Sequence, residues 1–236
     1  AVVGVFVLWF GWFGFNAGSE LAMDNWVAHC IMTTLLAGSA GVVGAGAAIW
    51  RKTGAMDVGM AGNGALAGLV SITAGTGTMS FAGSVAVGFI GGVIVVYSVL
   101  FIERRGIDDP VGAVSVHGVC GAWGTLAIGI IARHDDAFLG RDDAGLFYGG
   151  GFDQLLVQAI GVVIVAVWVL GTTEILFKVL KSTVGLRVSA EEELAGLDVA
   201  EHGSATSAAA VAAAAGSSER SRTGLASTGH RSLSSS

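Results

Sequence analysis

The sequence contains little of what marks a soluble domain or a disulfide-linked fold. Its 236 residues include one proline and two cysteines, and only 13% are charged, against about 25% in an average soluble domain. Cys30 and Cys120 lie in apolar runs, where cysteine is a small buried hydrophobe, and their number and spacing fit neither a disulfide framework nor a metal site. No basic cluster of the kind that binds nucleic acid occurs.

Candidate catalytic groups are equally scarce. No nucleophile with a partnering base, no cluster of metal ligands and no phosphate-binding loop rises above background. The sequence therefore argues against an enzyme, and we expect no metal and no cofactor.

Long hydrophobic segments dominate instead. Hydrophobic residues make up 53% of the chain, and uncharged runs of about 20 residues, the length of one membrane crossing, recur along it. We therefore predict an all-α membrane protein with six transmembrane helices. The predicted spans are Ala1 to about Phe15, Val27 to Trp50, Val58 to Thr73, Phe81 to Ile102, Pro110 to Ala132 and Asp153 to Lys181.

Local signals set two of these boundaries. No charge occurs from Val58 to Ile102, a stretch too long for one crossing, and the Gly/Thr cluster at 74–78 is its natural break. The fifth span is predicted to begin at Asp108-Asp109-Pro110, because an aspartate caps a helix and proline suits the first helical position. Glycines three or four residues apart inside the spans predict close helix packing. The clearest pairs are Gly41 with Gly44, Gly64 with Gly68, and Gly88 with Gly92.

Basic residues set the predicted orientation and the domain boundaries. With an even number of spans, most of them fall on one side, which the positive-inside rule places in the cytoplasm together with both ends of the chain. These residues are Arg51, Lys52, Arg104, Arg105, Lys178, Lys181 and Arg187. Residues 1–182 are the predicted membrane domain, and the Ala/Ser-rich residues 203–236 are predicted to be disordered. Because the chain opens inside an apolar segment without an initiator Met, we expect an N-terminal part to be missing.

His117 is the main candidate for function. It lies in the uncharged segment VGAVSVHGVCGAWGTLAIGIIA, and a titratable ring at membrane depth costs free energy unless it faces a pore or a partner. Counting 1.5 Å per residue from Pro110 puts it about 10 Å into its helix. We expect the ring to be buried and neutral, because desolvation disfavours its charged form, with Gly118 and Gly121 leaving room for a small solute. The alternative is a histidine that joins two helices by a hydrogen bond.

The first span ends in the aromatic string LWFGWFGFNAGSE. This is either an interfacial aromatic belt or a vestibule that attracts a cation, since ring faces contribute about 0.5 to 2 kcal/mol each. Ser19, Glu20 and Asp24 would accept the hydrogen bonds of that cation. Such a vestibule cannot carry a bare charge across hydrocarbon.

Two further ionisable sites have simpler interpretations. His29, near the start of the second span, is predicted to be a surface-seeking ring at the outer interface. Glu174 is predicted to pair with Lys178 one turn away on the last span.

Three strings together resemble the Amt/MEP/Rh family of ammonium transporters. They are GWFGFNAGS at 11–19, DDP with GAVSVHGVCGAWG at 108–124, and GLRV at 185–188 with GLD at 196–198. The family's order and spacing are kept over nearly the whole chain except about its last thirty residues. The resemblance implies a homotrimer of eleven-helix protomers, in which the six spans match helices six to eleven.

The resemblance also implies roles for four residues. Phe15 would be one of two stacked phenylalanines that gate the pore, Ser19 a hydroxyl at the external ammonium site, and Trp12 part of the aromatic lining. His117 would be one of two paired pore histidines. The partner residues belong to the family's first five helices, which this sequence lacks.

Beyond the membrane domain, residues 183–202 would form the cytoplasmic regulatory region that couples protomers and, in many members, meets a PII-type protein. The predicted function is transport across the cell membrane of ammonium, with methylammonium as its analogue: NH4+ is bound outside, loses a proton and crosses as NH3. The alternatives are an ammonium sensor, against which the tail without a folded output domain argues, and a channel for a neutral solute such as carbon dioxide.

Overall fold

The computed structural model describes residues 1–133 and 144–197, and this part of the chain is helical with no strand. The chain divides into two compact units, residues 1–170 and 171–236. The predicted disordered tail, 203–236, lies outside the described residues, as does the end of the predicted regulatory region, 198–202. The helices are α1 (Val2–Gly18), α2 (Asn25–Thr53), α3 (Val58–Thr73), α4 (Phe81–Arg104), the π-helix η1 (Val114–Val119), α5 (Cys120–Ile131), the 3-10 helix η3 (Leu146–Tyr148), α6 (Asp153–Thr183) and α7 (Ala190–Ala195).

Each predicted span corresponds to a helical segment. Four of them are long and apolar enough to cross a membrane: α2, α4, the continuous segment Val114–Ile131, and α6. The other two, α1 and α3, are apolar but have 17 and 16 residues, slightly short of a typical crossing. The predicted break at 74–78 is confirmed, because α3 ends at Thr73 and α4 begins at Phe81.

Side-chain caps explain where three of these helices begin. The Asp24 carboxylate accepts the N–H of Trp26 at 2.7 Å and so starts α2. Asp57 accepts the N–H of Met60 at 2.6 Å at the start of α3, and the Ser80 hydroxyl plays the same part for α4. Each cap satisfies one of the donors that the first turn of a helix leaves unpaired.

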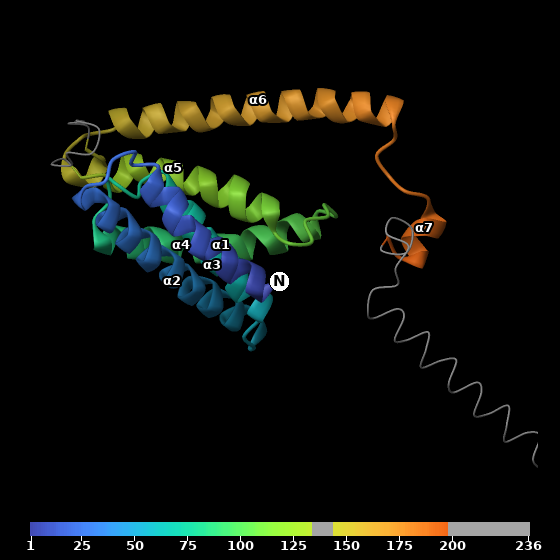
Figure 1. The fold of residues 1–236 in the computed structure, drawn as a ribbon, viewed down its shortest axis with the longest axis horizontal. Helices are drawn as coiled ribbons and strands as arrows, with labels where there is room; N and C mark the ends of the chain where they lie inside the picture. The colour runs from blue at the N-terminus through green and yellow to red at the C-terminus, as the bar shows by residue number, and fades with distance from the viewer. Residues whose placement is uncertain (134–143, 198–236) are drawn as a thin grey trace, which may run out of the picture. The chain divides into compact units, whose positions relative to one another are not determined.

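Small residues hold the centre of the first unit together. Helix α2 packs most extensively against α4 and α3, and Figure 1 shows α1 to α4 lying side by side. Gly88 and Gly92 of α4 lie directly against the backbone of Ala37 and Gly41 in α2, and Gly68 of α3 approaches Ala37 as well. The predicted close packing of the glycine pairs is therefore confirmed, and it lets apolar helices pack where no hydrophobic effect drives them together.

We predict that Gly92→Ala destabilises the full-length protein by about 1 to 3 kcal/mol through overpacking. A Cβ at Gly92 would meet the carbonyl group of Gly41 and lie 2.9 Å from the Ala45 nitrogen. The midpoint of thermal unfolding in detergent measures the effect. Gly161→Ala in α6 is the matched control, because its Cβ would meet nothing within 4 Å. Equal midpoints for the two variants would contradict the close packing.

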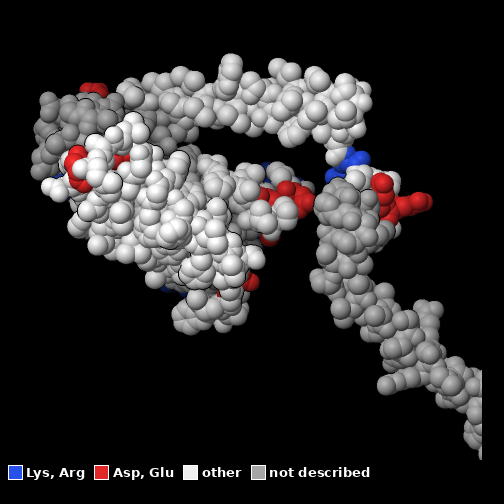
Figure 2. Space-filling view, viewed as in Figure 1, with Lys and Arg blue, Asp and Glu red and all other residues white. Residues whose placement is uncertain are grey.

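Charged side chains lie mainly at helix ends and in loops. Figure 2 shows that the face of the first unit turned to the viewer is almost free of charge between these ends. On α6, the predicted pair of Glu174 and Lys178 is confirmed, with 3.0 Å between the carboxylate and the ammonium nitrogen. Both side chains are well exposed, so the pair contributes little to stability.

The second unit contains a capped helix in the segment predicted to be regulatory. The Ser189 hydroxyl accepts the N–H of Glu192, and the Glu192 carboxylate accepts the Ser189 N–H at 2.8 Å, which together form a capping box. The Glu192 carboxylate also accepts the Ser189 hydroxyl at 2.8 Å. The hydrogen bonds that this carboxylate accepts, first from the backbone N–H and then from the hydroxyl of Ser189, lower the pKa of the Glu192 carboxyl. Arg187 adds an ion pair with Glu193 at 3.6 Å.

The lowered pKa of Glu192 predicts that α7 loosens in acid. Because the folded helix favours the ionised carboxylate, its stabilisation is present above the ordinary glutamate pKa of about 4.3 and is lost as the pH falls through the lowered value. Hydrogen exchange of the amides of 190–196, corrected for its intrinsic pH dependence, measures this loosening. Ser189→Ala keeps the backbone hydrogen bond to the carboxylate, so the decisive variant is Glu192→Gln, which should raise exchange at pH 7 and remove most of the acid dependence. An unchanged pH profile in that variant would contradict the role of the capping box.

Candidate functional site

Three of the four predicted site residues meet in one groove of the first unit. The groove has a volume of about 410 Å³ and lies between α1, α3 and the η1–α5 segment. Its lining residues are Trp12, Phe15, Val70, Thr73, Ala74, His117, Gly121 and Thr125. Residues about 100 positions apart in the sequence therefore share one surface, and this surface combines aromatic rings, two hydroxyls and one imidazole.

The aromatic side of the groove comes from α1. Trp12 donates its indole N–H to the Thr73 hydroxyl at 2.8 Å, and that hydroxyl donates to the Leu69 carbonyl at 2.7 Å. The Thr73 hydroxyl therefore points its hydrogen at the Leu69 carbonyl and its lone pair at Trp12, and this hydrogen bond ties Trp12 of α1 to α3. Phe15 packs edge-on against Trp12 with ring centroids 6.1 Å apart, yet 59% of Phe15 is exposed. One aromatic ring is thus held in place while its neighbour has room to move.

His117 lies on the π-helix η1, which no local sequence signal predicted. The predicted helix start at Pro110 is wrong by about three residues. Pro110 lies in a turn closed by the Gly112 N–H on the Asp109 carbonyl at 2.9 Å, and Gly112 has a φ of +72° that ends the turn. The imidazole therefore lies within the first turn of its helical segment, closer to the helix end than the predicted 10 Å.

The His117 ring is exposed to the groove rather than buried as predicted, because no described residue of this chain covers the open side of the groove. It makes no hydrogen bond to another described residue, which argues against the alternative of a histidine that joins two helices. Gly121, which also lines the groove, leaves open space there, since a Cβ on it would touch only Val70, at 3.7 Å. A polar ring thus stands beside open space, as a conducting path would require.

Ser19 does not line the groove. It lies at the end of α1, where its exposed hydroxyl donates to the Phe15 carbonyl at 2.6 Å. The two carboxylates expected to help it hold a cation already have partners within the chain. Glu20 accepts the N–H of Ala22 at 2.8 Å, and Asp24 caps α2. An ionised carboxylate has further acceptor sites, so the part of Glu20 and Asp24 in holding a cation stays a prediction.

His29 is not simply a surface-seeking ring. Its Nε2 lies 3.0 Å from the Met79 carbonyl, and the ring stacks on Phe81 at a centroid distance of 5.1 Å. Trp26 packs edge-on against its other side. This half-buried ring ties the start of α2 to the loop between α3 and α4.

Sequence reasoning missed several polar residues that shape the site. Thr73 and Thr125 look like ordinary small residues in apolar helices, but both line the groove. Asn16 follows Phe15, is 3% exposed, and donates to the Thr34 hydroxyl at 2.9 Å. A polar side chain inside an apolar helix was the available signal for all three. Among the described residues, no group of His, Cys, Asp and Glu is arranged to hold a metal ion.

These features define an all-helical protein with membrane-length apolar helices and a partly polar groove between them. Comparison with known proteins identifies its family. The model of the Ammonium Transporter Family matches residues 1–207, and the chain belongs to this family.

The relatives that it matches are named as transporters. Over 207 residues the chain is 47% identical to the ammonium transporter Amt2 of Archaeoglobus fulgidus, covering 86% of this chain and 44% of Amt2. Over 209 residues it is 38% identical to an ammonium transporter of Mycobacterium tuberculosis, covering 85% of this chain and 43% of that protein. The chain thus spans less than half the length of these curated relatives.

Solved structures share the fold. A structure named Sensor Amt Protein superposes with a TM-score of 0.76 at 38% identity, over 84% of this chain and 48% of that one. The Mep2 protein of Candida albicans gives a TM-score of 0.75 at 29% identity, over 81% of this chain and 43% of that chain.

Proposed function

We propose that the full-length protein transports ammonium across the cell membrane. The observation that carries this proposal is the meeting of Trp12, Phe15 and His117 in one groove. Family membership and relatives named as ammonium transporters support it. The six helical segments would correspond to helices six to eleven of an eleven-helix protomer.

The chemistry follows from the cost of moving a charge. Taking an ion out of water into an apolar passage costs several kcal/mol, whereas neutral NH3 is small and less strongly solvated. NH4+ would be held where Phe15 and Trp12 offer ring faces, with Ser19 at the outer edge, since rings attract a cation that keeps part of its hydration shell. It would pass a proton there to a water molecule, which leaves NH3.

The neutral molecule would then pass His117. A neutral imidazole offers one donor and one acceptor, so NH3 could exchange hydrogen bonds with it while it crosses. Thr73 and Thr125 add hydroxyls to the lining of the same groove.

The assembly and location follow the family resemblance. The protein would be a homotrimer in the cell membrane with a cytoplasmic C-terminus, as the basic loop residues favour. Residues 183–202 would form the regulatory region, and a PII-type protein is its expected partner. The capping box of α7 gives this region a defined helix.

A sensor of ammonium is the second candidate function. It is favoured by one observation, the structural likeness to the protein named Sensor Amt Protein. A sensor would bind ammonium without passing it at a useful rate. Flux measurement therefore separates the two candidates.

Methylammonium uptake by the full-length protein in proteoliposomes tests the proposal. We expect saturable uptake that ammonium inhibits, and a Ser19→Ala variant with apparent affinity weakened at least about tenfold, because a hydrogen bond to a charged group contributes about 1.5 to 3 kcal/mol. Ser182→Ala is the control, since its hydroxyl also donates to a carbonyl of its own helix, that of Val179 at 2.8 Å. Binding without uptake would favour the sensor, and neither binding nor uptake would contradict both.

A further inference from the structure

The π-helix that carries His117 lies between two separate sets of anchoring contacts. We propose that Asp109 and Ser98 are positioning residues, which hold the wide turn of η1 open and thereby aim the His117 ring into the groove. The proposal rests on the proposed function only for the part of its test that measures transport.

The upstream anchor is a carboxylate that binds two backbone amides. Asp109 is 7% exposed, and its two oxygens accept the N–H groups of Val114 at 3.2 Å and Ser115 at 3.3 Å. The Ser115 side chain is fully buried and accepts a hydrogen bond from the Ser98 hydroxyl of α4 at 2.9 Å. The first residues of η1 are therefore fixed to α4 and to the preceding loop.

The downstream anchor is the contact of α5 with α3 and α4. Trp123 donates its indole N–H to the Val87 carbonyl at 3.1 Å, and the Cys120 thiol lies 3.5 Å from the Gly91 carbonyl. Gly124 lies directly against the backbone of Ser71. These contacts fix the rotation of α5 independently of the loop at 108–112.

The wide turn joins the two anchors. The Cys120 N–H bonds to the Ser115 carbonyl, five residues back, so the segment holds one residue more per turn than an α-helix would. Removing that extra residue from the turn would rotate one anchored part against the other by about 100°. His117 lies inside this turn, so the anchors decide where its ring points. A π-turn inside an α-helix is rare and frequently occurs at functional sites.

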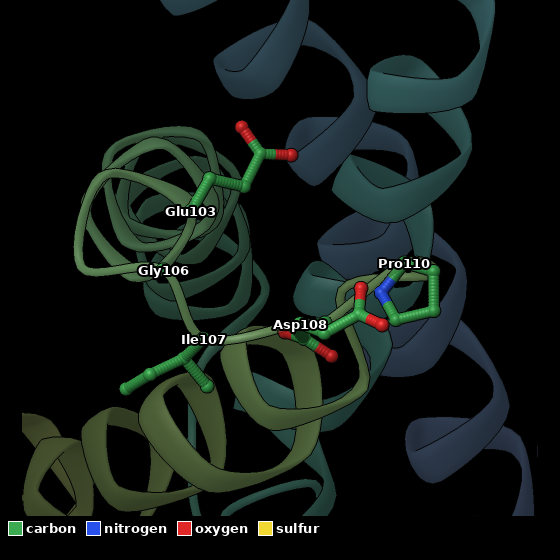
Figure 3. A pocket seen from close by; sticks show the side chains of 6 residues that line it. Glu103, Gly106, Ile107, Asp108 and Pro110 are labelled. Atoms are coloured by element: carbon green, nitrogen blue, oxygen red, sulfur yellow. The ribbon is translucent and has the colours of Figure 1, made fainter. Parts of the chain in front are cut away.

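The neighbouring carboxylate offers a matched control. Figure 3 shows the loop that leaves α4 at Gly106 and carries Ile107, Asp108 and Pro110 beside a hollow, whose volume is about 290 Å³. Asp108 is exposed and has no hydrogen bond to η1. Asp108→Asn therefore removes the same charge as Asp109→Asn without touching the anchor.

The experiment compares these two variants of the full-length protein in lipid nanodiscs. Mass spectrometry gives two readouts: amide exchange in peptides covering 116–120, and modification of His117 by diethyl pyrocarbonate. His29 is the internal reference for the modification, because its ring is held by the Met79 carbonyl and not by η1. In Asp109→Asn we expect exchange to rise about tenfold, as for the loss of one hydrogen bond to a charged group. The loss of the same hydrogen bond should also change the ratio of His117 to His29 modification by a factor of about three or more. Asp108→Asn should match the wild type in both.

A second variant keeps the test decisive if Asp109→Asn does not fold. Ser98→Ala removes only the hydroxyl bond to Ser115 and should change both readouts in the same direction by a smaller factor. If the variant that folds matches Asp108→Asn in both readouts, the proposal is overturned.

Transport supplies an independent readout. Asp109→Asn should lower methylammonium uptake in the wild-type background and add nothing to His117→Ala, since both changes act through one ring. Additive losses would overturn the positioning role. If the wild type shows no uptake, the proposed function fails, and if His117→Ala leaves uptake intact, the pore role of this ring fails. In either case amide exchange and ring modification still decide the positioning proposal.

Discussion

Replacing His117 with Ala should lower methylammonium uptake by the full-length protein by a factor of about five to 150. The imidazole lines the same groove as Gly121 and the aromatic side chains of Trp12 and Phe15 from α1. Without it, a neutral amine would cross an apolar stretch with unmet hydrogen bonds, at a cost of about 1 to 3 kcal/mol. Because each 1.4 kcal/mol is about a factor of ten in rate, the loss should be large.

His29→Gln is the control for this prediction. His29 lies outside the groove lining, and glutamine retains a side-chain donor for the Met79 carbonyl. We expect uptake within about twofold of the wild type, as for substitutions away from the site. Unchanged uptake in His117→Ala, measured on protein that folds and assembles as the wild type does, would remove the pore role of this ring.

Breaking the hydrogen bond between Trp12 and Thr73 should lower uptake about tenfold, because an indole N–H left without its partner in an apolar groove costs about 1 to 3 kcal/mol. The bond is 2.8 Å long, and the Thr73 hydroxyl is itself directed by the Leu69 carbonyl. Thr73→Val removes the acceptor at nearly constant volume, whereas Thr73→Ser keeps it. We expect the valine variant to lose uptake and the serine variant to retain most of it.

A double-variant cycle separates this bond from a general packing effect. Trp12→Phe removes the donor and keeps a ring over the groove, so the pair Trp12→Phe and Thr73→Val should cost little more than either change alone. Thr183→Val is the control, because its hydroxyl also donates to a carbonyl of its own helix, that of Val179, but does not line the groove. Strictly additive losses would show that the two side chains act separately.

Much of the fold could be predicted because the helices follow from the lengths of the apolar runs and from the polar or glycine-rich residues that separate them. The Gly/Thr cluster at 74–78 ends α3 in the structure as it does in the sequence pattern. The pairing of Glu174 with Lys178 follows from helical spacing alone. The small residues at 88 and 92 predicted close approach, although not that α2 would be the partner of α4.

The start of the fifth segment could not be predicted, since local signals disagree with tertiary contacts. Asp109 and Pro110 look like a cap followed by the first helical residue. In the structure the carboxylate reaches past the turn to Val114 and Ser115. The wide turn around His117 exists because contacts on both sides fix the helix, and no spacing within the segment encodes them.

The candidate site was predicted in its residue types but not in its environment. Trp12, Phe15 and His117 come together as the resemblance implied. The exposure of His117 and the contribution of Thr73 depend on which helices face each other. Glu20 was predicted from its charge to help hold a cation, whereas its hydrogen bond with the Ala22 N–H was not predicted.

The central claim is that Trp12, Phe15 and His117 line one passage for a small nitrogenous solute. A structure of the full-length protein in a lipid bilayer with ammonium present tests it most directly. The account predicts an enclosed passage that contains the His117 ring, with density for the solute between that ring and the aromatic side chains of α1. A ring directed into lipid, or a groove filled solidly by other side chains, would contradict it.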